Sequence, residues 1–257
     1  MKIATFNINN IGKRLATLLL WLEREKPDVV CVQELKTEQN SFPADVLRSA
    51  GYEAVWVGER SWNGVAILAR ARFPVLTRSA LPGDDRDRQA RYVEAAVGGV
   101  LISCIYLPNG NPQPGPKFNY KLAWFERLIV HAKNLITAGV PVVLAGDYNV
   151  VPTPEDIYPT RSLDTNALVQ PASREAFDRL LRQGWTDALR KVHPSGPLWT
   201  FWDYKFERWP ADKGMRLDHL LLSPGISSLL TNAGVDRWVR GEDNASDHAP
   251  AWITLNM

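Results

Sequence analysis

An aspartate and an asparagine follow one short apolar run near the middle of the sequence. Residues 142–145 read VVLA, and after Gly146 come Asp147 and Asn149, two positions apart. A short apolar run closed by a glycine predicts a buried strand, and side chains at i and i+2 of a strand point to the same side. Such a pair can hold a water, a phosphate or a cation where the sheet ends. A simple turn is the alternative, because Asp and Asn are common turn residues.

A carboxylate also ends the apolar run over residues 29–33. Glu34 follows the sequence VVCVQ, and a buried carboxylate costs on the order of several kcal/mol unless it is paired or bound to a metal. One interpretation is a salt bridge to Lys36 or to an arginine. The other is a ligand for Mg²⁺, a hard cation that binds carboxylate oxygens and keeps several waters.

A histidine and two further acids lie near the C-terminus. Asp247 and His248 come just before the last apolar run, and Asp218 lies near the start of the stretch RLDHLLLS. If Asp218 accepts a hydrogen bond from one ring nitrogen of His248, it fixes the tautomer and favours the imidazolium. Such a dyad beside a carboxylate and a metal suits phosphodiester hydrolysis, which needs an activated water and charge neutralisation on the phosphoryl oxygens. A capping Asp next to a surface His is the alternative.

Motifs for other kinds of catalysis are absent from the sequence. It contains no GxSxG element and no GxxxxGK[ST] phosphate loop, and Cys31 and Cys104 both lie inside apolar runs rather than in a loop beside a histidine. Two buried free thiols suit a reducing compartment, and the N-terminus MKIATFNINN lacks the apolar region of a secretion signal. We therefore expect a cytoplasmic protein.

The composition is that of an ordinary globular protein. The 257 residues are 45% hydrophobic and 23% charged, with a formal net charge of +2. This size allows one sizeable core, and without a linker-like segment we expect a single domain over residues 1–257. The charge permits a nucleic-acid partner without demanding one, and no apolar stretch reaches membrane-spanning length.

Short strands and a few helices must position the polar residues. We expect strands over 2–7, 28–34, 52–58, 64–70, 73–78, 91–97, 100–107, 141–147, 216–223 and 251–255. We expect helices over 12–26, 117–138 and 173–183, the last capped by Ser173, and an irregular loop over 151–170. This pattern predicts two packed sheets flanked by helices. Eight polar residues then stand where apolar runs start or stop: Asn7, Glu34, Tyr106, Asp147, Asn149, Asp218, Asp247 and His248.

Eight stretches in this order resemble the exonuclease III family of apurinic/apyrimidinic endonucleases, within the endonuclease/exonuclease/phosphatase superfamily. They are ATFNINNI, DVVCVQELK, WNGVAIL, YLPNG, LAGDYNVVPTPEDIY, TFWDY, GMRLDHLLLS and SDHAPAW, between residues 4 and 252. The resemblance implies a four-layer α/β sandwich, with two mixed β-sheets packed face to face and helices on the outside. It also implies a monomer that uses Mg²⁺, or Mn²⁺ in its place, to cleave double-stranded DNA 5′ to abasic sites, with 3′→5′ exonuclease and 3′-end-cleaning activity.

The resemblance also implies roles for individual residues. Metal binding is expected of Asn7, Glu34, Asp147, Asn149, Asp247 and His248. Catalysis is expected of Tyr106, Asp147, Asn149, Asp218 and His248. Glu34 would be the principal metal ligand, Asp147 would orient or deprotonate the attacking water, and Asn149 would hold the phosphate. Which of Asp147, Tyr106 and His248 moves each proton stays open.

The resemblance implies that an apolar pocket for a sugar without a base selects the substrate, because apolar walls exclude a base by size. The expected walls are Phe201, Trp202, Met215 and Leu217. Packing beneath the loop is an equally good interpretation of Trp202, and the flexible Met215 would make the pocket less tight. Asn109 resembles a phosphate-contacting asparagine, and Arg91 is expected to contact DNA.

Two other functions stay open. The first is another phosphodiesterase of the superfamily, acting on a lipid, an inositol phosphate or RNA; the stretches TFWDY and GMRLDH favour the DNA branch instead. The second is a catalytically weak DNA-binding relative. Such a protein would be expected to lose its metal and histidine positions, whereas Glu34, Asp147 and His248 are all present here.

Overall fold

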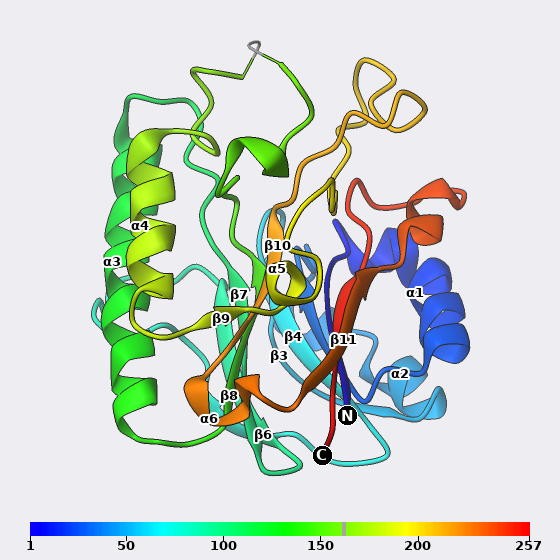
Figure 1. The fold of residues 1–257 in the computed structure, drawn as a ribbon. Helices are drawn as coiled ribbons and strands as arrows, with labels where there is room; N and C mark the ends of the chain where they lie inside the picture. The colour runs from blue at the N-terminus through cyan, green and yellow to red at the C-terminus, as the bar shows by residue number, and fades with distance from the viewer. Residues whose placement is uncertain (161–162) are drawn as a thin grey trace.

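Two six-stranded sheets form the centre of the computed structural model, which describes residues 1–160 and 163–257 (Figure 1). The first sheet has the order β11-β12-β1-β2-β4-β3, with bounds Leu230–Val235, Ala251–Leu255, Lys2–Asn7, Val29–Gln33, Val65–Arg70 and Tyr52–Val57. The second has the order β5-β6-β7-β8-β10-β9, with bounds Val75–Arg78, Tyr92–Val97, Val100–Tyr106, Val142–Asp147, Asp218–Leu222 and Thr186–Asp187. Both sheets are mixed, because β1–β2 and β7–β8 pair in parallel and their neighbours pair antiparallel.

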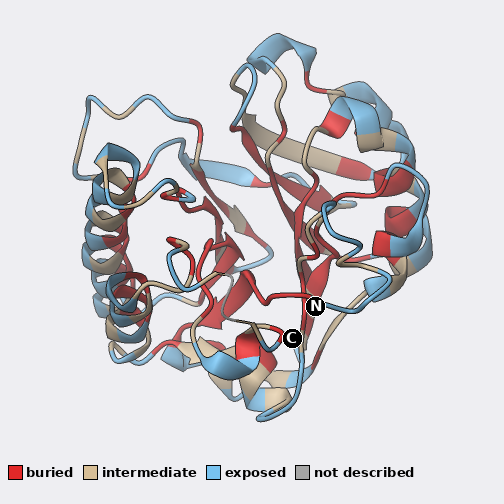
Figure 2. Ribbon diagram, turned by 90° about the horizontal axis from the view of Figure 1, so that it is seen from above, coloured by how far each residue is buried: buried red, intermediate tan, exposed pale blue. Residues whose placement is uncertain are grey.

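Of the described helices, four cover the outer faces of the two sheets, and the last two pack against the core between the sheets. Their bounds are Ile11–Glu25 (α1), Ala44–Ser49 (α2), Pro116–Thr137 (α3), Pro171–Leu181 (α4), Ala188–Val192 (α5) and Pro224–Ser227 (α6). Figure 1 shows α1 and α2 on one side of the strands and α3 and α4 on the other. Seen from above, the strands are buried between helices whose outer faces are exposed (Figure 2).

Three apolar clusters hold the layers together. The inner faces of both sheets form one, which includes Ile67 and Ile102 and both free cysteines. Phe125 of α3 and Phe177 of α4 belong to the second, and Trp21 of α1 to the third. Each such large side chain, when fully buried, contributes about 1.5–3 kcal/mol. Helix, sheet, sheet and helix therefore follow one another, as the predicted four-layer sandwich requires.

Crossover helices set the direction of the central strands. Parallel neighbours cannot be joined by a tight hairpin, so a longer connection is needed. Helix α1 connects β1 to β2, and α3 connects β7 to β8. Helix α1 begins where the Asn10 side chain accepts a hydrogen bond from the Lys13 backbone (3.0 Å), and it ends at Lys26 in the left-handed conformation. In each parallel pair the two carboxyl ends thus emerge at the same edge of the sheet.

The structure differs from the sequence prediction at several elements. Strand β11 and helix α2 were not predicted; the sequence LTNAGV of β11 mixes polar residues and glycine, as an edge strand tolerates. Ser173 does not cap α4, which begins at Pro171 after Gln170. The buried Ser173 hydroxyl instead donates to the Ala167 carbonyl (2.7 Å). Proline favours the first helical position because it lacks an N–H and its φ is preset.

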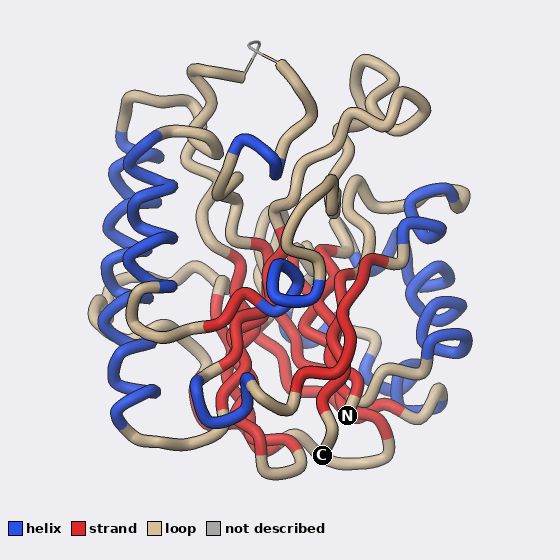
Figure 3. The backbone as a smooth tube through the Cα atoms, viewed as in Figure 1, coloured by secondary structure: helices blue, strands red, loops and turns tan. Residues whose placement is uncertain are grey.

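Long loops gather at the end of the molecule opposite to the two termini (Figure 3). The described part of the predicted loop over 151–170 is irregular apart from a short 3₁₀ turn, Pro154–Asp156. Residues 161 and 162 of that prediction lie outside the described residues. Among the described helices, none combines the length and the apolar character needed to span a membrane.

Candidate active site

Four of the predicted polar residues stand at the ends of central strands. Asn7 ends β1, Tyr106 ends β7, Asp147 ends β8 and Asp218 begins β10. In the second sheet Asp147 pairs in register with Tyr106 on one side and with Asp218 on the other. Ligand sites in mixed and parallel sheets commonly lie at such carboxyl ends.

The Asn7 side chain joins the two sheets. Its amide nitrogen donates to Glu34 Oε1 (2.8 Å) in the first sheet's half of the site and to Asp147 Oδ2 (2.9 Å) in the other. The Tyr106 hydroxyl also donates to Glu34 Oε1 (2.9 Å). Burial raises the pKa of Tyr106 well above its usual value, and the Glu34 carboxylate raises it further, so this tyrosine is a hydrogen-bond donor. The structure therefore brings Asn7, Glu34, Tyr106 and Asp147 together.

Asp147 is almost completely buried, with 1% of its surface exposed. Burial raises its pKa to about 7; the charge of His248 opposes the shift and the charge of Asp218 adds to it. The Asn149 backbone N–H donates to Asp147 Oδ1 (2.8 Å), and the Asn149 amide nitrogen lies 3.3 Å from Oδ2. Asn149 has a φ of 47° and thus turns the chain back towards the carboxylate. A carboxylate with a pKa near neutrality is suited to accept a proton.

His248 is held between two carboxylates. Its Nδ1 donates to Asp218 Oδ2 (2.8 Å), and its Nε2 lies 3.8 Å from Asp147 Oδ2. Burial disfavours the imidazolium, but the neighbouring acids, Asp218 above all, outweigh burial and raise the pKa of His248 to about 10. In this protonated form the ring can donate hydrogen bonds from both nitrogens, and metal binding by His248 stays a prediction.

Backbone contacts hold Asp218 in place. The Thr200 hydroxyl oxygen accepts hydrogen bonds from the backbone N–H groups of Leu217 (3.0 Å) and Asp218 (3.1 Å). Within the described residues, Asp218 Oδ1 is buried without a hydrogen-bond partner. Such an oxygen is a site for a water or another donor.

Glu34 forms the salt bridge considered from the sequence. Lys36 Nζ lies 2.8 Å from Glu34 Oε2 and donates to Asn9 Oδ1 (2.6 Å). Asn9 in turn donates to Asp247 Oδ1 (2.9 Å). The Lys36 ammonium shows that a positive charge fits between these oxygens. Burial alone would raise the pKa of Glu34, but Lys36 and the hydrogen bond from Asn7 outweigh burial and lower it.

The donor set suits a hard divalent cation. Glu34 and Asp247 offer carboxylate oxygens, and Asn7 and Asn9 offer amide oxygens, the ligand type that Mg²⁺ prefers. In residues 1–160 and 163–257, no three His, Cys, Asp or Glu side chains gather to hold a metal by themselves. Amide oxygens and waters would therefore complete the coordination, as is usual for Mg²⁺.

A pocket of about 570 Å³ adjoins this cluster, with apolar side chains on part of its wall and Asp203, Arg208 and Lys213 on the rest. Among its lining residues are Asn109, Tyr158, Phe201, Phe206, Arg208 and Met215. The Phe201 ring lies 4.9 Å from the His248 ring, edge to face, so one wall of the pocket touches the candidate catalytic histidine. Reciprocal backbone hydrogen bonds of 2.9 Å fix Phe201 beside Met215.

Two residues expected in the walls lie elsewhere. Trp202 is fully buried, stacks edge to face on Trp209 and donates its indole N–H to Asp212 Oδ1 (3.0 Å). Adjacent residues of an extended chain face opposite sides, so when Phe201 faces the pocket Trp202 cannot. Leu217 is 2% exposed and packs behind Met215 in a small apolar cluster.

The two residues expected to contact DNA, Asn109 and Arg91, lie beside Asn149 and Tyr106 of the cluster. The exposed Asn109 donates to Asn149 Oδ1 (2.9 Å), and the Arg91 guanidinium lies 4.7 Å from the centre of the Tyr106 ring. Sequence reasoning did not assign a role to Asn9 or to Ser246, whose hydroxyl donates to the Asn7 carbonyl (2.6 Å). The i, i+2 spacing of Asn7 and Asn9 was the available signal.

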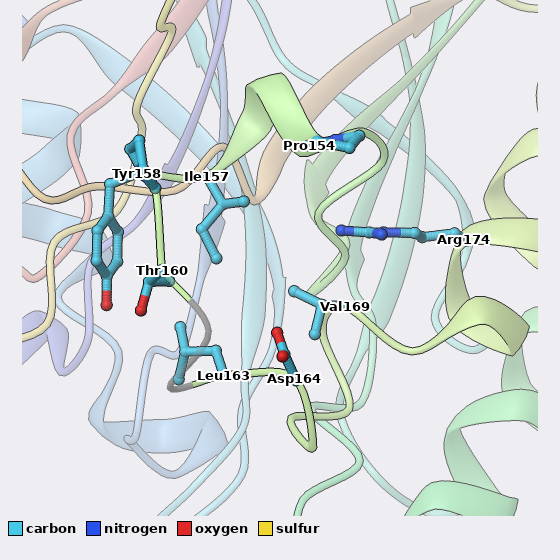
Figure 4. Close-up of a pocket in the computed structure, with 9 residues that line it drawn as sticks. Pro154, Ile157, Tyr158, Thr160, Leu163, Asp164, Val169 and Arg174 are labelled. Atoms are coloured by element: carbon cyan, nitrogen blue, oxygen red, sulfur yellow. The ribbon is translucent and has the colours of Figure 1, made fainter.

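A second hollow, of about 530 Å³, lies beside the first (Figure 4). Tyr158 and Leu163 line both hollows, and Arg174 reaches into the second from the first turns of α4. The acids of the cluster line neither hollow, but Phe201 of the first hollow contacts the His248 ring at 4.9 Å. We therefore assign the chemistry to the first hollow.

Comparisons with known proteins show which family and which folds the chain is similar to. Residues 4–248 match the Endonuclease/Exonuclease/phosphatase family. The chain is 28% identical to "Exodeoxyribonuclease III" of Haemophilus influenzae, over 98% of each chain. Its fold is similar to that of an AP endonuclease from Archaeoglobus fulgidus (TM-score 0.95, 32% identity, all of both chains). It is equally similar to a 3′ phosphatase, NExo, from Neisseria bound to product DNA hairpin (TM-score 0.95, 35% identity, all of both chains).

Proposed function

The chain belongs to the Endonuclease/Exonuclease/phosphatase family, and from this premise we propose that it is a DNA repair nuclease of the exodeoxyribonuclease III type. Its reaction would be the metal-dependent hydrolysis of phosphodiester bonds 5′ to abasic sites in double-stranded DNA, together with 3′→5′ exonuclease and 3′-end-cleaning activity. The names of the relatives support cleavage at abasic sites as well as reactions at 3′ ends, because exodeoxyribonuclease III, an AP endonuclease and a 3′ phosphatase are among them.

One observation carries the proposal: the Asp218–His248 pair and Asp147 converge beside a pocket whose nearest wall, Phe201, is apolar. The pair has a 2.8 Å hydrogen bond, and Phe201 links the ring of His248 to the pocket at 4.9 Å. Reacting groups and a shape-selective hollow thus share one wall. A phosphodiesterase for a lipid or inositol phosphate would not need a pocket for a base-less sugar.

We assign the cation, in our proposal Mg²⁺ with Mn²⁺ as a substitute, to Glu34, Asn7 and Asp247. When bound, it would neutralise charge on the phosphoryl oxygens and on the leaving oxygen. Asn149 and Asp147 are its closest further candidates. The donor chemistry of these side chains, oxygen throughout, is the support for this assignment.

The chain's own groups account for the proton movements. Asp147, with a pKa of about 7, is suited to orient and deprotonate a water. The imidazolium of His248, held by Asp218, would donate a hydrogen bond to a phosphoryl oxygen and so stabilise developing negative charge. The Tyr106 hydroxyl and the Asn149 amide would donate further hydrogen bonds near the phosphate.

Cleaning of 3′ ends is the second activity that a specific observation favours. The NExo chain, described as a 3′ phosphatase, is 35% identical to this one over its whole length. A terminal phosphate and an internal phosphodiester present the same phosphoryl oxygens, so one reaction centre can serve both. The pocket, rather than the reaction centre, would then set the balance between them.

The proposal is tested with two duplexes, one with a single abasic site and one with a 3′-phosphate. Each is incubated with Mg²⁺, with Mn²⁺ and with a chelator, and the product termini are mapped. We expect a 3′-hydroxyl product that forms only with a divalent cation. Cleavage in the chelator, or turnover of a phosphoinositide in preference to both duplexes, would contradict the proposal.

We also propose that residues 1–257 act as one domain and as a monomer in the cytoplasm. The family match over residues 4–248 supports a single unit. Cys31 and Cys104 are both free and buried, which suits a reducing compartment.

A further inference from the structure

One buried lysine has no part in the reaction described above. Lys121, in the second turn of α3, has no exposed surface. Its Nζ donates to the backbone carbonyls of Asn149 (2.5 Å) and Asn109 (3.2 Å). Among the ion pairs of the described residues, none joins Lys121 to a carboxylate. A buried ammonium without a carboxylate partner is unfavourable, and a position near a helix N-terminus makes it more so.

The turn at Gly110 packs closely against the Lys121 side chain. Gly110 has a φ of +88°, and a Cβ at that position would lie 2.7 Å from Lys121 Cδ. A residue with a side chain would therefore collide with the lysine stem as well as adopt a strained backbone. The lysine thus passes directly beneath the turn that carries Asn109.

The two carbonyls that Lys121 binds belong to residues whose side chains meet at the site. Asn109 donates to Asn149 Oδ1 (2.9 Å), and the Asn149 backbone N–H donates to Asp147 Oδ1 (2.8 Å). Asn149 adopts the left-handed conformation (φ 47°), which asparagine tolerates better than most residues with a side chain. A donor on its carbonyl opposes relaxation of that turn. Lys121 therefore joins the turns after β7 and β8 from below.

Resting on the proposed function, we propose that Lys121 is a positioning residue for it. By binding the carbonyls of Asn109 and Asn149, it orients both side-chain amides towards the phosphate of the DNA substrate. Replacement by Met keeps the length and the apolar stem but removes the donors and the charge. Because a displacement of about 1 Å at a reacting group can lower turnover by roughly 100-fold, Lys121→Met is expected to lower kcat on the order of 10–100-fold and to change KM much less.

A double-mutant cycle separates positioning from a general loss of structure. We expect Lys121→Met to lower kcat strongly in the wild-type background but less than about 3-fold in an Asn149→Ala background, because the residue it acts through is gone. Lys117→Met, exposed on the same helix, is the matched control and should leave kcat unchanged. Equal losses of kcat in both backgrounds, or no loss in either, would overturn the inference.

Hydrogen exchange gives a readout that needs no turnover. Backbone amides of residues 147–150 should exchange faster in Lys121→Met than in Lys117→Met, whereas those of β3 should not change. Unchanged exchange of the amides of residues 147–150 would refute the inference, whether or not the wild type is active. A wild type that is inactive on both duplexes would refute only the proposed function. Should Lys121→Met fail to fold, Lys121→Gln, which keeps one donor, takes its place in both experiments.

Discussion

Asp218 begins strand β10 of one sheet, and His248 lies just before strand β12 of the other. Even so, Asp218 Oδ2 lies 2.8 Å from His248 Nδ1. The carboxylate fixes the ring so that Nε2 faces Asp147 at 3.8 Å. The imidazolium is therefore both oriented and charged before any substrate binds. Preorganised charge of this kind is usually the largest single contribution to catalysis.

We predict that Asp218→Asn lowers kcat by roughly 10²–10⁴-fold, because an amide can neither stabilise the imidazolium nor fix its tautomer. Binding of the abasic duplex, measured in a chelator, should change little. Asp243→Asn, at an exposed position, is the control. A kcat within twofold of wild type would mean that Asp218 does not act through His248.

For Asp147→Asn we expect kcat to fall by several orders of magnitude while the free energy of unfolding does not decrease. Burial of the Asp147 carboxylate is the largest cause of its raised pKa and outweighs the attraction to His248, so a neutral amide relieves a cost of burying charge. Single-turnover kinetics and chemical denaturation measure the two quantities. Loss of stability together with loss of activity would assign Asp147 a structural role, and an unaltered rate would remove it from the mechanism.

Glu34→Gln should raise the Mg²⁺ concentration needed for half-maximal activity by about 10-fold or more, because the cation loses a charged oxygen ligand. The maximal rate at saturating Mg²⁺ should fall less. A Mg²⁺ titration of the cleavage rate measures this, with the exposed Glu38→Gln as control. The same Mg²⁺ dependence in variant and wild type would leave Glu34 as a partner of Lys36 only.

Much of the fold was predictable because apolar runs and their breaks are local signals. The central strands, the helices α1 and α3 and the positions of Asn7 and Asp147 at strand ends follow from such runs. Strand β11 was missed because LTNAGV has no apolar alternation, and its pairing with β12 and the burial of Ala233 depend on the tertiary fold. The Ser173 cap was wrong because Pro171, two residues earlier, begins the helix.

The site was less predictable in its details. Types and positions indicated Glu34, Asp147 and His248, but partners 140 positions apart, such as Asn7 and Asp147, are settled only by the packing of the two sheets. Trp202 was expected either at the pocket or packed beneath the loop, and the structure has it packed on Trp209, because neighbours on an extended chain face opposite sides. Lys121 carries no sequence signal, since a lysine on a helix is normally exposed.

Phe201→Ala should reduce discrimination between abasic and intact DNA by roughly 10-fold or more, because an apolar wall that excludes a base is removed. The ratio of kcat/KM for the abasic duplex to that for the same duplex with an intact base measures this discrimination. The value of kcat/KM for the 3′-phosphate duplex should change less than that for the abasic duplex. Phe73→Ala, exposed and outside the pocket, serves as control. Equal changes on both duplexes would indicate that Phe201 acts only through its contact with His248.

His219 makes stability depend on pH. The ring is fully buried, and its Nδ1 accepts a hydrogen bond from Arg216 (2.9 Å), so it must be neutral. Burial, reinforced by the Arg216 charge, lowers its pKa from 6.5 to about 3. Between these two pKa values the unfolded chain binds a proton that the folded chain does not. The contribution of His219 to the free energy of unfolding is therefore fully present above pH 6.5 and is lost as the pH falls towards 3, by at most about 1.4 kcal/mol per pH unit. Chemical denaturation at pH 7.5, 6 and 5 should show a shallower pH dependence for His219→Gln than for wild type. His193→Gln, at a partly exposed histidine, should keep the wild-type slope; identical slopes in all three proteins would show that His219 does not titrate on unfolding.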